Sequence, residues 1–261
     1  MPRFKLTIEY AGTKYSGWQI QKNARTVQGE LAAAIERVTR RRDFELYGSG
    51  RTDAGVHAVA QVAHLHVATS LPADTLAWRV NEELPGDINL LTASPASRRF
   101  HARHDAVARR YVYQIARRRT AFAKPYVWWV KDALDVTRMR QAAVTFTGFH
   151  DFASFAATSD EDSEKSTRVL VEGLEVRETA DLVLVGIEGS HFLWKMVRRI
   201  VGVLVEVGRG GMEPDAAASL VSSASGLPAR LTAPASGLFL ERVYYEGDAR
   251  NSKLEPIRFL W

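Results

Sequence analysis

Two periods of apolar residues follow one another at the start of the chain. Residues 4–10 alternate between apolar and polar side chains, which predicts a strand with one buried face. After a polar loop, apolar side chains recur at spacings of three and four over 27–38. This second period predicts a helix that begins after an N-cap at Thr26 and runs to about Arg40.

The same two periods continue along the rest of the chain. We expect further strands at 44–48, 61–68, 108–117, 168–177, 182–187 and 237–245. We expect further helices at 76–84, at 135–146, at 192–207 with Gly208 as C-cap, and after Pro214. Because neighbouring strands are mixed with helices, this order predicts an α+β fold.

The pattern divides into two halves with a similar order of elements: a strand, a helix, a pair of strands and a helix. We expect an N-terminal half over 1–105, a C-terminal half over 106–246 and a tail over 247–261 of uncertain structure. The apolar end of the tail, 257–261, is expected to dock on the body or on a partner chain. Neither the tail nor the acidic loop 160–164 has an assigned role.

Composition narrows the class of protein. The 261 residues are 46% hydrophobic and 25% charged, which is typical of a globular protein and excludes a disordered chain, a collagen and a coiled coil. The absence of cysteine excludes disulfides, thiolate metal sites and cysteine nucleophiles. No apolar run reaches the roughly 18 residues of a membrane span, and the N-terminus lacks a signal-peptide core. We therefore expect a cytoplasmic protein with no membrane association.

Positive charge is concentrated in one stretch of the chain. Residues 98–119 contain eight arginines and one acid, Asp105, a net of +7. Since the whole chain carries +5, the remainder sums to 5 − 7 = −2. Such an arginine band is typical of a surface that binds a phosphate backbone. The alternative is a solvated face of salt bridges.

Several common catalytic motifs are missing, and one histidine cluster is a weak metal candidate. The chain has no G-x-x-x-x-G-K-[ST], no H-E-x-x-H and no G-x-S-x-G, so ATP-binding, zinc-protease and serine-hydrolase functions lack support. His57, His64 and His66 lie close together in sequence, and the last two share a strand face. A metal-dependent hydrolase is the weakest hypothesis here, because simple hydrogen bonding also explains strand histidines.

The glycine-rich stretch 47–66 presents charged residues on a turn. Arg51 and Asp53 stand between glycines, which let the backbone approach a ligand closely. A carboxylate held on such a turn can act chemically, and the neighbouring guanidinium can contact phosphate or favour the ionised carboxylate. The alternative is a tight turn with an Asx cap and a surface arginine.

Seven segments, in order, resemble the TruA-type tRNA pseudouridine synthases. The strongest, "GSGRTDAGVHA", covers 48–58. The others lie at 10–31, 81–88, 100–115, 149–155, 192–202 and 233–240. The resemblance therefore spans nearly the whole chain. It implies two ferredoxin-like halves that share a central, mostly antiparallel sheet, with the active-site cleft between them.

The resemblance also implies an activity and its residues. The enzyme would isomerise uridine to pseudouridine in the tRNA anticodon stem-loop, at tRNA positions 38–40, after flipping the base from its stack. Asp53 would be the catalytic residue and is expected to act as the nucleophile, with action as a base, and at either the ribose or the uracil ring, left as alternatives. Arg51 would fill the space that the base leaves, and Tyr111 would stack on the uracil. Arg198 would pair with Asp53. No cofactor or metal is implied. For Tyr111 a place in the core, and for Arg198 an exposed helix position, remain alternatives.

The remaining implications concern RNA binding and assembly. Arg103, Arg109, Arg110, Lys195 and Arg199 are candidate RNA-binding residues. Lys195 and Arg199 stand where the family often has histidine and asparagine, which adds positive charge and bears on substrate preference. The partners implied are tRNA and a second copy of the chain in a homodimer. A non-catalytic RNA-binding protein or RNA chaperone is the rival function.

Overall fold

The computed structural model describes residues 1–157, 166–250 and 253–257 and divides the chain into two compact units. Unit 1 comprises Met1–Val107 and Phe239–Ala249, and unit 2 comprises Ala108–Leu238 and Arg250–Trp261. The halves expected from the sequence stay a prediction. They differ from these units mainly in the last strand, whose residues from Phe239 group with unit 1. Among the described residues, no helix is long and apolar enough to cross a bilayer.

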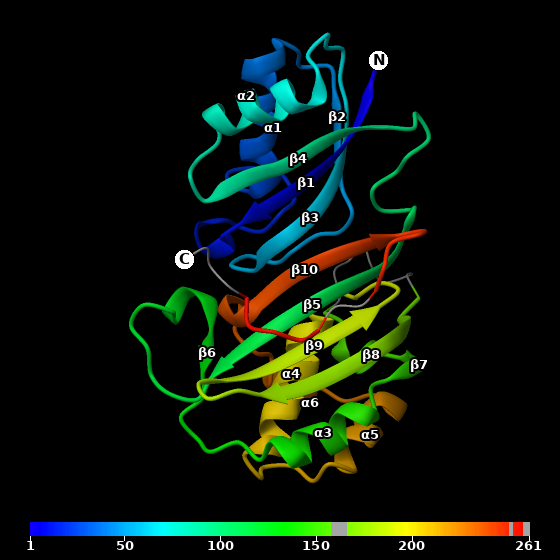
Figure 1. Ribbon diagram of the computed structural model, residues 1–261. Helices are drawn as coiled ribbons and strands as arrows, with labels where there is room; N and C mark the ends of the chain where they lie inside the picture. Colours follow the sequence, from blue (N-terminus) through cyan, green and yellow to red (C-terminus); the bar gives the residue numbers. More distant parts are fainter. Residues whose placement is uncertain (158–165, 251–252, 258–261) are drawn as a thin grey trace. The chain divides into compact units, whose positions relative to one another are not determined.

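Unit 1 is a sheet with two helices. In chain order its elements are β1 (Arg3–Tyr10), η1 (Gly12–Lys14), α1 (Val27–Thr39), β2 (Glu45–Gly48), β3 (His57–His66), α2 (Ala73–Glu83), β4 (Ile88–Ala96) and β10 (Leu238–Tyr245). Strand β1 lies between β4 and β3, antiparallel to both. β3 also pairs antiparallel with β2 and parallel with β10. The helices α1 and α2 lie together against the sheet (Figure 1).

The first elements form as their patterns predict. The alternating side chains of β1 are buried in turn from Phe4 to Tyr10, which places this face in the core. Thr26 is the N-cap of α1, where its side chain accepts a hydrogen bond from the backbone N–H of Gly29. The helix ends at Arg40, whose φ of 56° is left-handed.

Unit 2 consists of mostly antiparallel strands and helices. Its elements are β5 (Ala106–Ala116), η2 (Lys124–Tyr126), β6 (Trp128–Trp129), α3 (Val136–Val144), β7 (Gly148–Asp151), η3 (Ala153–Phe155), β8 (Arg168–Glu178), β9 (Leu182–Gly189), α4 (Met196–Gly208), α5 (Ala216–Ser222), α6 (Leu227–Arg230) and η5 (Ala235–Gly237). The strands follow the order β5-β9-β8-β7, each antiparallel to its neighbour. β6 pairs with the end of β5 in parallel. The α+β fold class and the mostly antiparallel pairing are confirmed.

Strand β4 is the main element that the sequence pattern did not predict. Its alternation is broken, because Leu91 and Thr92 are both exposed in succession. The cause is a register shift opposite Thr7 and Ile8 in the pairing with β1. A bulge of this kind moves side chains off their expected face, so a period of two no longer fits.

Helix α4 is shorter at its start than expected, and its C-cap differs. It begins at Met196 rather than Phe192, after Lys195 adopts a left-handed conformation with φ of 63°. The predicted C-cap, Gly208, is instead the last helical residue, and Arg209 is the cap. A Cβ at Gly208 would lie 2.8 Å from Cγ of Met139, so this glycine lets α3 approach α4 closely.

The tail packs on unit 2 where it is described. Leu254 is buried against Val112 of β5 and Leu184 of β9, with Ile257 beside them. A guanidinium nitrogen of Arg177 donates to the carbonyl of Leu254 at 2.6 Å. Of the apolar end 257–261 that is expected to dock, Ile257 is the residue described, and it packs beside this cluster. Residues 258–261 and the acidic loop 160–164 lie outside the described residues.

Candidate active site

Asp53 lies on the loop between β2 and β3, and this loop is held by the segment that follows β1. The N–H of Trp18 donates to the carbonyl of Thr52 at 3.1 Å, and the N–H of Gly55 donates to the carbonyl of Tyr15 at 3.3 Å. Within the loop, the N–H of Val56 donates to the carbonyl of Asp53 at 3.1 Å. Because of these bonds, the backbone on both sides of Asp53 is held in place. The side chain of Asp53 is half-buried.

Two glycines make this close backbone contact possible. Gly17 has a φ of 94°, and a Cβ there would lie 2.6 Å from the carbonyl oxygen of Thr52. A Cβ at Gly12 would lie 1.9 Å from the carbonyl oxygen of Val56. Both distances are shorter than real Cβ contacts, so any side chain at either position would displace the loop.

Buried side chains fasten the same loop. The hydroxyls of Tyr10 and Thr52 share a hydrogen bond of 2.8 Å. Gln61 of β3 accepts from the hydroxyl of Ser49 at 2.7 Å and donates to the carbonyl of Gly50 at 3.2 Å. The sequence pattern assigns no role to Tyr10 or Gln61. Tyr10 lies within the matched segment 10–31, and Gln61 follows the matched segment 48–58, but a matched segment does not show which side chains meet.

Arg51 and Arg103 line one shallow hollow of unit 1. Trp18, Tyr47 and Gly50 line it with them. Both arginines are exposed. The structure therefore brings two of the predicted cationic residues together beside the loop that carries Asp53.

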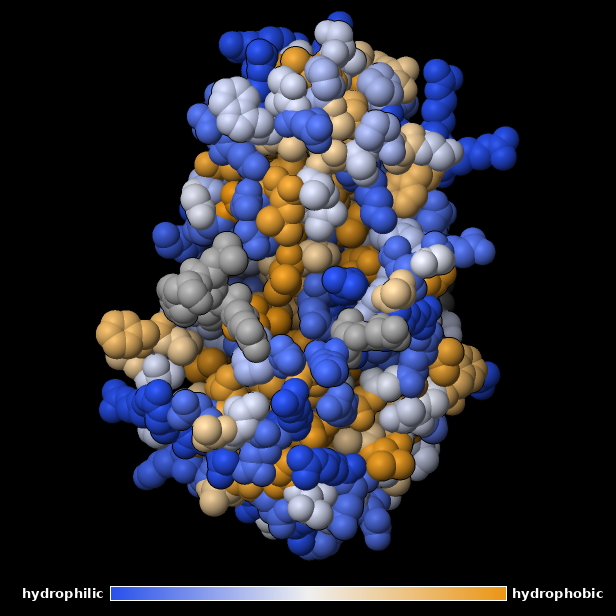
Figure 2. Space-filling model, viewed as in Figure 1, coloured by the Kyte–Doolittle hydropathy of each residue, from blue (hydrophilic) through white to orange (hydrophobic). Residues whose placement is uncertain are grey.

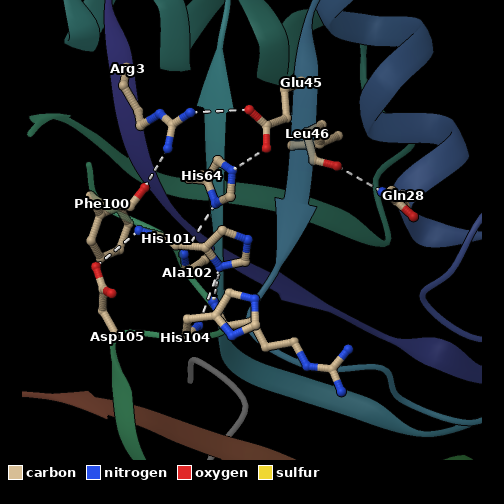
Figure 3. Close-up of polar contacts among 11 residues, drawn as sticks. Arg3, Gln28, Glu45, Leu46, His64, Phe100, His101, Ala102, His104 and Asp105 are labelled. Atoms are coloured by element: carbon tan, nitrogen blue, oxygen red, sulfur yellow. Dashed lines mark hydrogen bonds and ion pairs between the residues drawn. The ribbon is translucent and has the colours of Figure 1, made fainter. Parts of the chain in front are cut away.

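Figure 3 shows side chains of unit 1 around His101, Ala102, His104 and Asp105. Arg103 belongs to this loop. The ring of His64 is completely buried, and its Nδ1 accepts from the N–H of Ala102 at 3.1 Å. Its Nε2 lies 3.0 Å from Glu45, which also pairs with Arg3 at 3.0 Å. The bond from His64 is the main cause that lowers the pKa of the Glu45 carboxyl.

A second histidine caps the same loop. Nδ1 of His101 accepts from the N–H groups of Arg103 and His104, both at 3.2 Å. The N–H of His101 itself donates to Asp105 at 2.9 Å. Burial, followed by the nearby His104 and His64, lowers the pKa of His101. This direction agrees with the two N–H bonds that Nδ1 accepts.

The histidines considered as metal ligands hold the backbone instead. Both nitrogens of His64 are engaged, as described above. Nδ1 of His57 accepts from the N–H of Gly12 at 3.1 Å, and Nε2 of His66 lies 3.2 Å from the carbonyl of Met1. Over residues 1–157, 166–250 and 253–257, no group of three histidine, cysteine or acidic side chains is arranged to hold a metal. Hydrogen bonding therefore accounts for this cluster.

In unit 2, the two tyrosines of β5 have different surroundings. Tyr111 is half-buried, and Phe192 meets its ring edge-on with 5.3 Å between centroids. Tyr113 is completely buried, and its hydroxyl donates to the carbonyl of Pro234 at 2.8 Å. Burial raises the pKa of Tyr113. Tyr113 is therefore the core tyrosine, whereas Tyr111 is only half-buried.

The cationic residues at the start of α4 hold neighbouring loops. Arg198 donates from Nε to the carbonyl of Ala233 at 2.8 Å. Arg199 donates to the carbonyl of Ala156 at 2.6 Å, and burial lowers the pKa of its guanidinium. The ammonium of Lys195 lies 4.8 Å from the ring centre of Trp194. These residues lie together at one end of the helix.

The arginine band separates into two parts. Arg98, Arg99 and Arg103 belong to unit 1 and are exposed. In unit 2, Arg109 donates to the carbonyl of Ser190 at 2.8 Å, and Arg110 lies 3.8 Å from Glu188. Further ion pairs join Arg117 to Glu178 at 2.5 Å and Arg118 to Asp181 at 2.9 Å. The salt-bridged alternative thus describes much of the second part.

Comparison with known proteins connects these residues to a family. The sequence profile described as tRNA pseudouridine synthase matches residues 6–105 and 142–246. A tRNA pseudouridine synthase A of Brevibacillus brevis is 41% identical over 249 residues, covering 94% of this chain and all of the relative. That of Thermoanaerobacter sp. is 39% identical with the same coverage. That of Halalkalibacterium halodurans is 37% identical over 257 residues, covering 98% of this chain and 95% of the relative.

The matched regions include both the loop that carries Asp53 and the cationic start of α4. With the family profile covering most of the chain and relatives matched over nearly their whole length, the conclusion is direct: this protein belongs to the tRNA pseudouridine synthase A family, a family of isomerases.

Proposed function

We propose that this chain converts uridines of the tRNA anticodon stem-loop, at tRNA positions 38–40, to pseudouridine, with Asp53 as the nucleophile. Membership of the family makes the chain a tRNA pseudouridine synthase. The site within the tRNA and the role of the aspartate are the further steps that this proposal adds. The observation that supports them is the loop of Asp53, which backbone bonds and glycine contacts hold from both sides.

The proposed reaction rearranges one nucleotide without net oxidation. The bond between N1 and C1′ breaks, the uracil turns, and a bond forms between C5 and C1′. The C5 hydrogen leaves as a proton and N1 takes up a proton, so that the product is an isomer of the substrate. The proposed carboxylate nucleophile acts while the uracil is detached from the ribose. Both parts of the nucleotide must stay in the site during that time. A loop fixed in advance holds the carboxylate in one position, which lowers the cost of reaching the transition state.

Three further residues complete the proposed site. Arg51 lies on the same loop and is exposed, and we assign it to the space left by a flipped base. Tyr111 is half-buried on β5, and we assign its aromatic ring as the platform for uracil. Arg198 is assigned as the cation that pairs with the carboxylate of Asp53, in addition to its bond to Ala233.

The proposed RNA-binding residues are cations of both units. They are Arg103, Arg109, Arg110, Lys195 and Arg199. Several of these already hold a carbonyl or an acid, but a guanidinium has five N–H donors and can contact a phosphate as well. Arg103 is exposed and therefore the strongest candidate. The proposal also retains the expected homodimer and the cytoplasmic location of a tRNA-modifying enzyme.

Release of tritium from tRNA labelled at C5 of uridine tests the proposal, because the C5 hydrogen must leave. We expect release by the unaltered protein and none by Asp53→Asn, which keeps the shape of the side chain. Asp43→Asn is the matched control, since Asp43 is an exposed acid outside the loop. Both variants should bind tRNA as the unaltered protein does.

Two outcomes would contradict specific parts of the proposal. Release by Asp53→Asn would remove the aspartate mechanism, and a loss of its tRNA binding would make Asp53 structural. Retained release from tRNA whose anticodon stem-loop carries no labelled uridine would move the reaction to another part of the tRNA.

A further inference from the structure

An aromatic side chain projects from the loop between β5 and β6. Phe122 is 96% exposed, more than the other exposed large apolar side chains of the described residues. Trp129, at the end of the same loop, is 42% exposed. In Figure 2 this loop, on the left of unit 2 beside the label β6 in Figure 1, presents apolar atoms next to hydrophilic ones. The family profile matches on both sides of this segment but leaves out residues 106–141.

Several hydrogen bonds hold the backbone of this loop. The N–H of Ala123 donates to the hydroxyl of Thr120 at 3.3 Å, and the N–H of Tyr126 donates to the carbonyl of Ala123 at 2.8 Å. The buried Gln114 of β5 donates to the carbonyl of Tyr126 at 3.1 Å. Phe122 is therefore held at the tip of a turn, where exposing its ring to water has a cost that burial elsewhere would avoid.

Cations outnumber acids around this aromatic residue. Residues 117–131 contain three arginines, two lysines and no acid, and two of the arginines, Arg117 and Arg118, pair with Glu178 and Asp181 of neighbouring segments. The guanidinium of Arg119 lies 5.9 Å from the ring centre of Trp129, and Lys124 is exposed. Aromatic rings interleaved with cations are the composition that single-stranded nucleic acid favours, since the rings stack on bases while the cations contact phosphates.

We propose that this loop is a second RNA contact of the enzyme, in which Phe122 stacks on an unpaired base of the tRNA other than the uridine that reacts. Arg119 and Lys124 contact the adjoining phosphates. RNA is favoured over an apolar protein partner because the exposed ring stands beside the cations Arg119 and Lys124, and cations suit a polyanion. This inference rests on tRNA as the substrate, not on the role of Asp53.

Spacing along β5 separates this contact from the proposed target site. Strand β5 ends at Ala116, five residues beyond Tyr111, and Phe122 lies six residues further along the loop. At about 3.3 Å per residue, the part of the strand from Tyr111 to its end spans roughly 17 Å.

The test compares two exposed phenylalanines of unit 2. Phe122→Ala removes the proposed stacking platform, and Phe149→Ala is the matched control. Phe149 is 64% exposed on β7, which β8 and β9 separate from β5. We measure the Kd for unmodified tRNA at several salt concentrations with the full-length proteins. We expect Phe122→Ala to weaken binding about fivefold to hundredfold, Phe122→Trp to restore it, and Phe149→Ala to leave it unchanged.

A second measurement separates binding from chemistry. Tritium release in a single turnover, with each protein saturating, should proceed at the same rate for Phe122→Ala as for the unaltered protein. Arg119→Gln and Lys124→Gln should each lower the slope of log Kd against log salt by about one.

The inference is overturned if Phe122→Ala binds tRNA as tightly as the unaltered protein. It is also overturned if Phe122→Ala changes the oligomeric state in sedimentation, because Phe122 would then be a contact between subunits. Failure of the proposed function is seen separately. If the unaltered protein binds tRNA through Phe122 but releases no tritium, the proposed RNA contact stands and the proposed reaction fails.

Discussion

The two units position their candidate site residues by different means. In unit 1, backbone packs directly on backbone around Asp53, with Gly17 and Gly12 leaving no room for a side chain. In unit 2, guanidinium groups span the gaps, as Arg198 and Arg199 do by donating to carbonyls of distant loops. The first arrangement tolerates almost no change in residue type. The second depends on long polar side chains. From the sequence alone, these structural side chains cannot be distinguished from side chains that contact RNA.

The largest expected effect comes from placing a side chain in the backbone contact of unit 1. Gly17→Ala puts a Cβ 2.6 Å from the carbonyl oxygen of Thr52 at a positive φ. We expect a loss of at least about 2 kcal/mol in the free energy of unfolding, together with most of the activity. Chemical denaturation and tritium release measure the two effects. Gly86→Ala is the control, since a Cβ there meets nothing within 4 Å. Equal stability of the two variants would contradict the backbone lock.

A smaller effect is expected from removing a guanidinium in unit 2. Arg199→Met removes the hydrogen bond to the carbonyl of Ala156, so this carbonyl loses the guanidinium donor. We expect a loss of about 2 kcal/mol in the free energy of unfolding, and a smaller relative change in tRNA affinity. Arg118→Gln is the control, because its pair with Asp181 is exposed and contributes little. A large loss of affinity with unchanged stability would instead make Arg199 mainly an RNA contact.

The hydroxyl bond between Tyr10 and Thr52 tests whether side chains add to the backbone lock. Tyr10→Phe and Thr52→Val each remove this buried bond of 2.8 Å. We expect a loss of about 1 kcal/mol in stability and a severalfold lower kcat, with KM nearly unchanged, because Asp53 is less well positioned. Thr52→Ser should restore kcat. If KM rises and kcat stays the same, the bond does not position the catalytic loop.

The smallest effect concerns the loop that carries Arg103. Since the pKa of His101 is lowered below its usual 6.5, the unfolded chain takes up a proton near that pH while the folded chain does not. Stability therefore falls as the pH falls below about 6.5. His101→Asn should make this fall shallower by less than about 1 kcal/mol between neutral and mildly acid pH. Thermal unfolding at several pH values measures it, with the exposed His191→Asn as control; identical slopes for both variants would rule His101 out.

The sequence predicted most of the helices and strands in which one hydrophobic period continues without a break. The α1 helix with its Thr26 cap and the strand β1 follow from side chains alone, because local propensity and burial agree there. The first residue of α4 could not be predicted, because nothing in the residue type of Lys195 indicates its left-handed backbone conformation. β4 was hidden by its register shift.

For the candidate site, the sequence identified residue types but not their surroundings. An arginine contributes the same formal charge whether it is exposed like Arg103 or paired like Arg110 with Glu188. Counting charge along 98–119 therefore overstated the part of the band that is open to RNA. The support of the Asp53 loop by Gly17 and Tyr10 depends on contacts between distant segments, which no local pattern contains.

The packing of the tail has a consequence for how sequences in this family vary together. A Cβ on Gly186 of β9 would lie 3.0 Å from Cδ1 of Leu254, so a side chain larger than hydrogen presses on the docked tail. The family profile ends at residue 246, before this contact. Relatives without a docked tail are released from that restriction. Glycine at this strand position and an apolar residue in the tail should therefore covary, appearing together and being lost together.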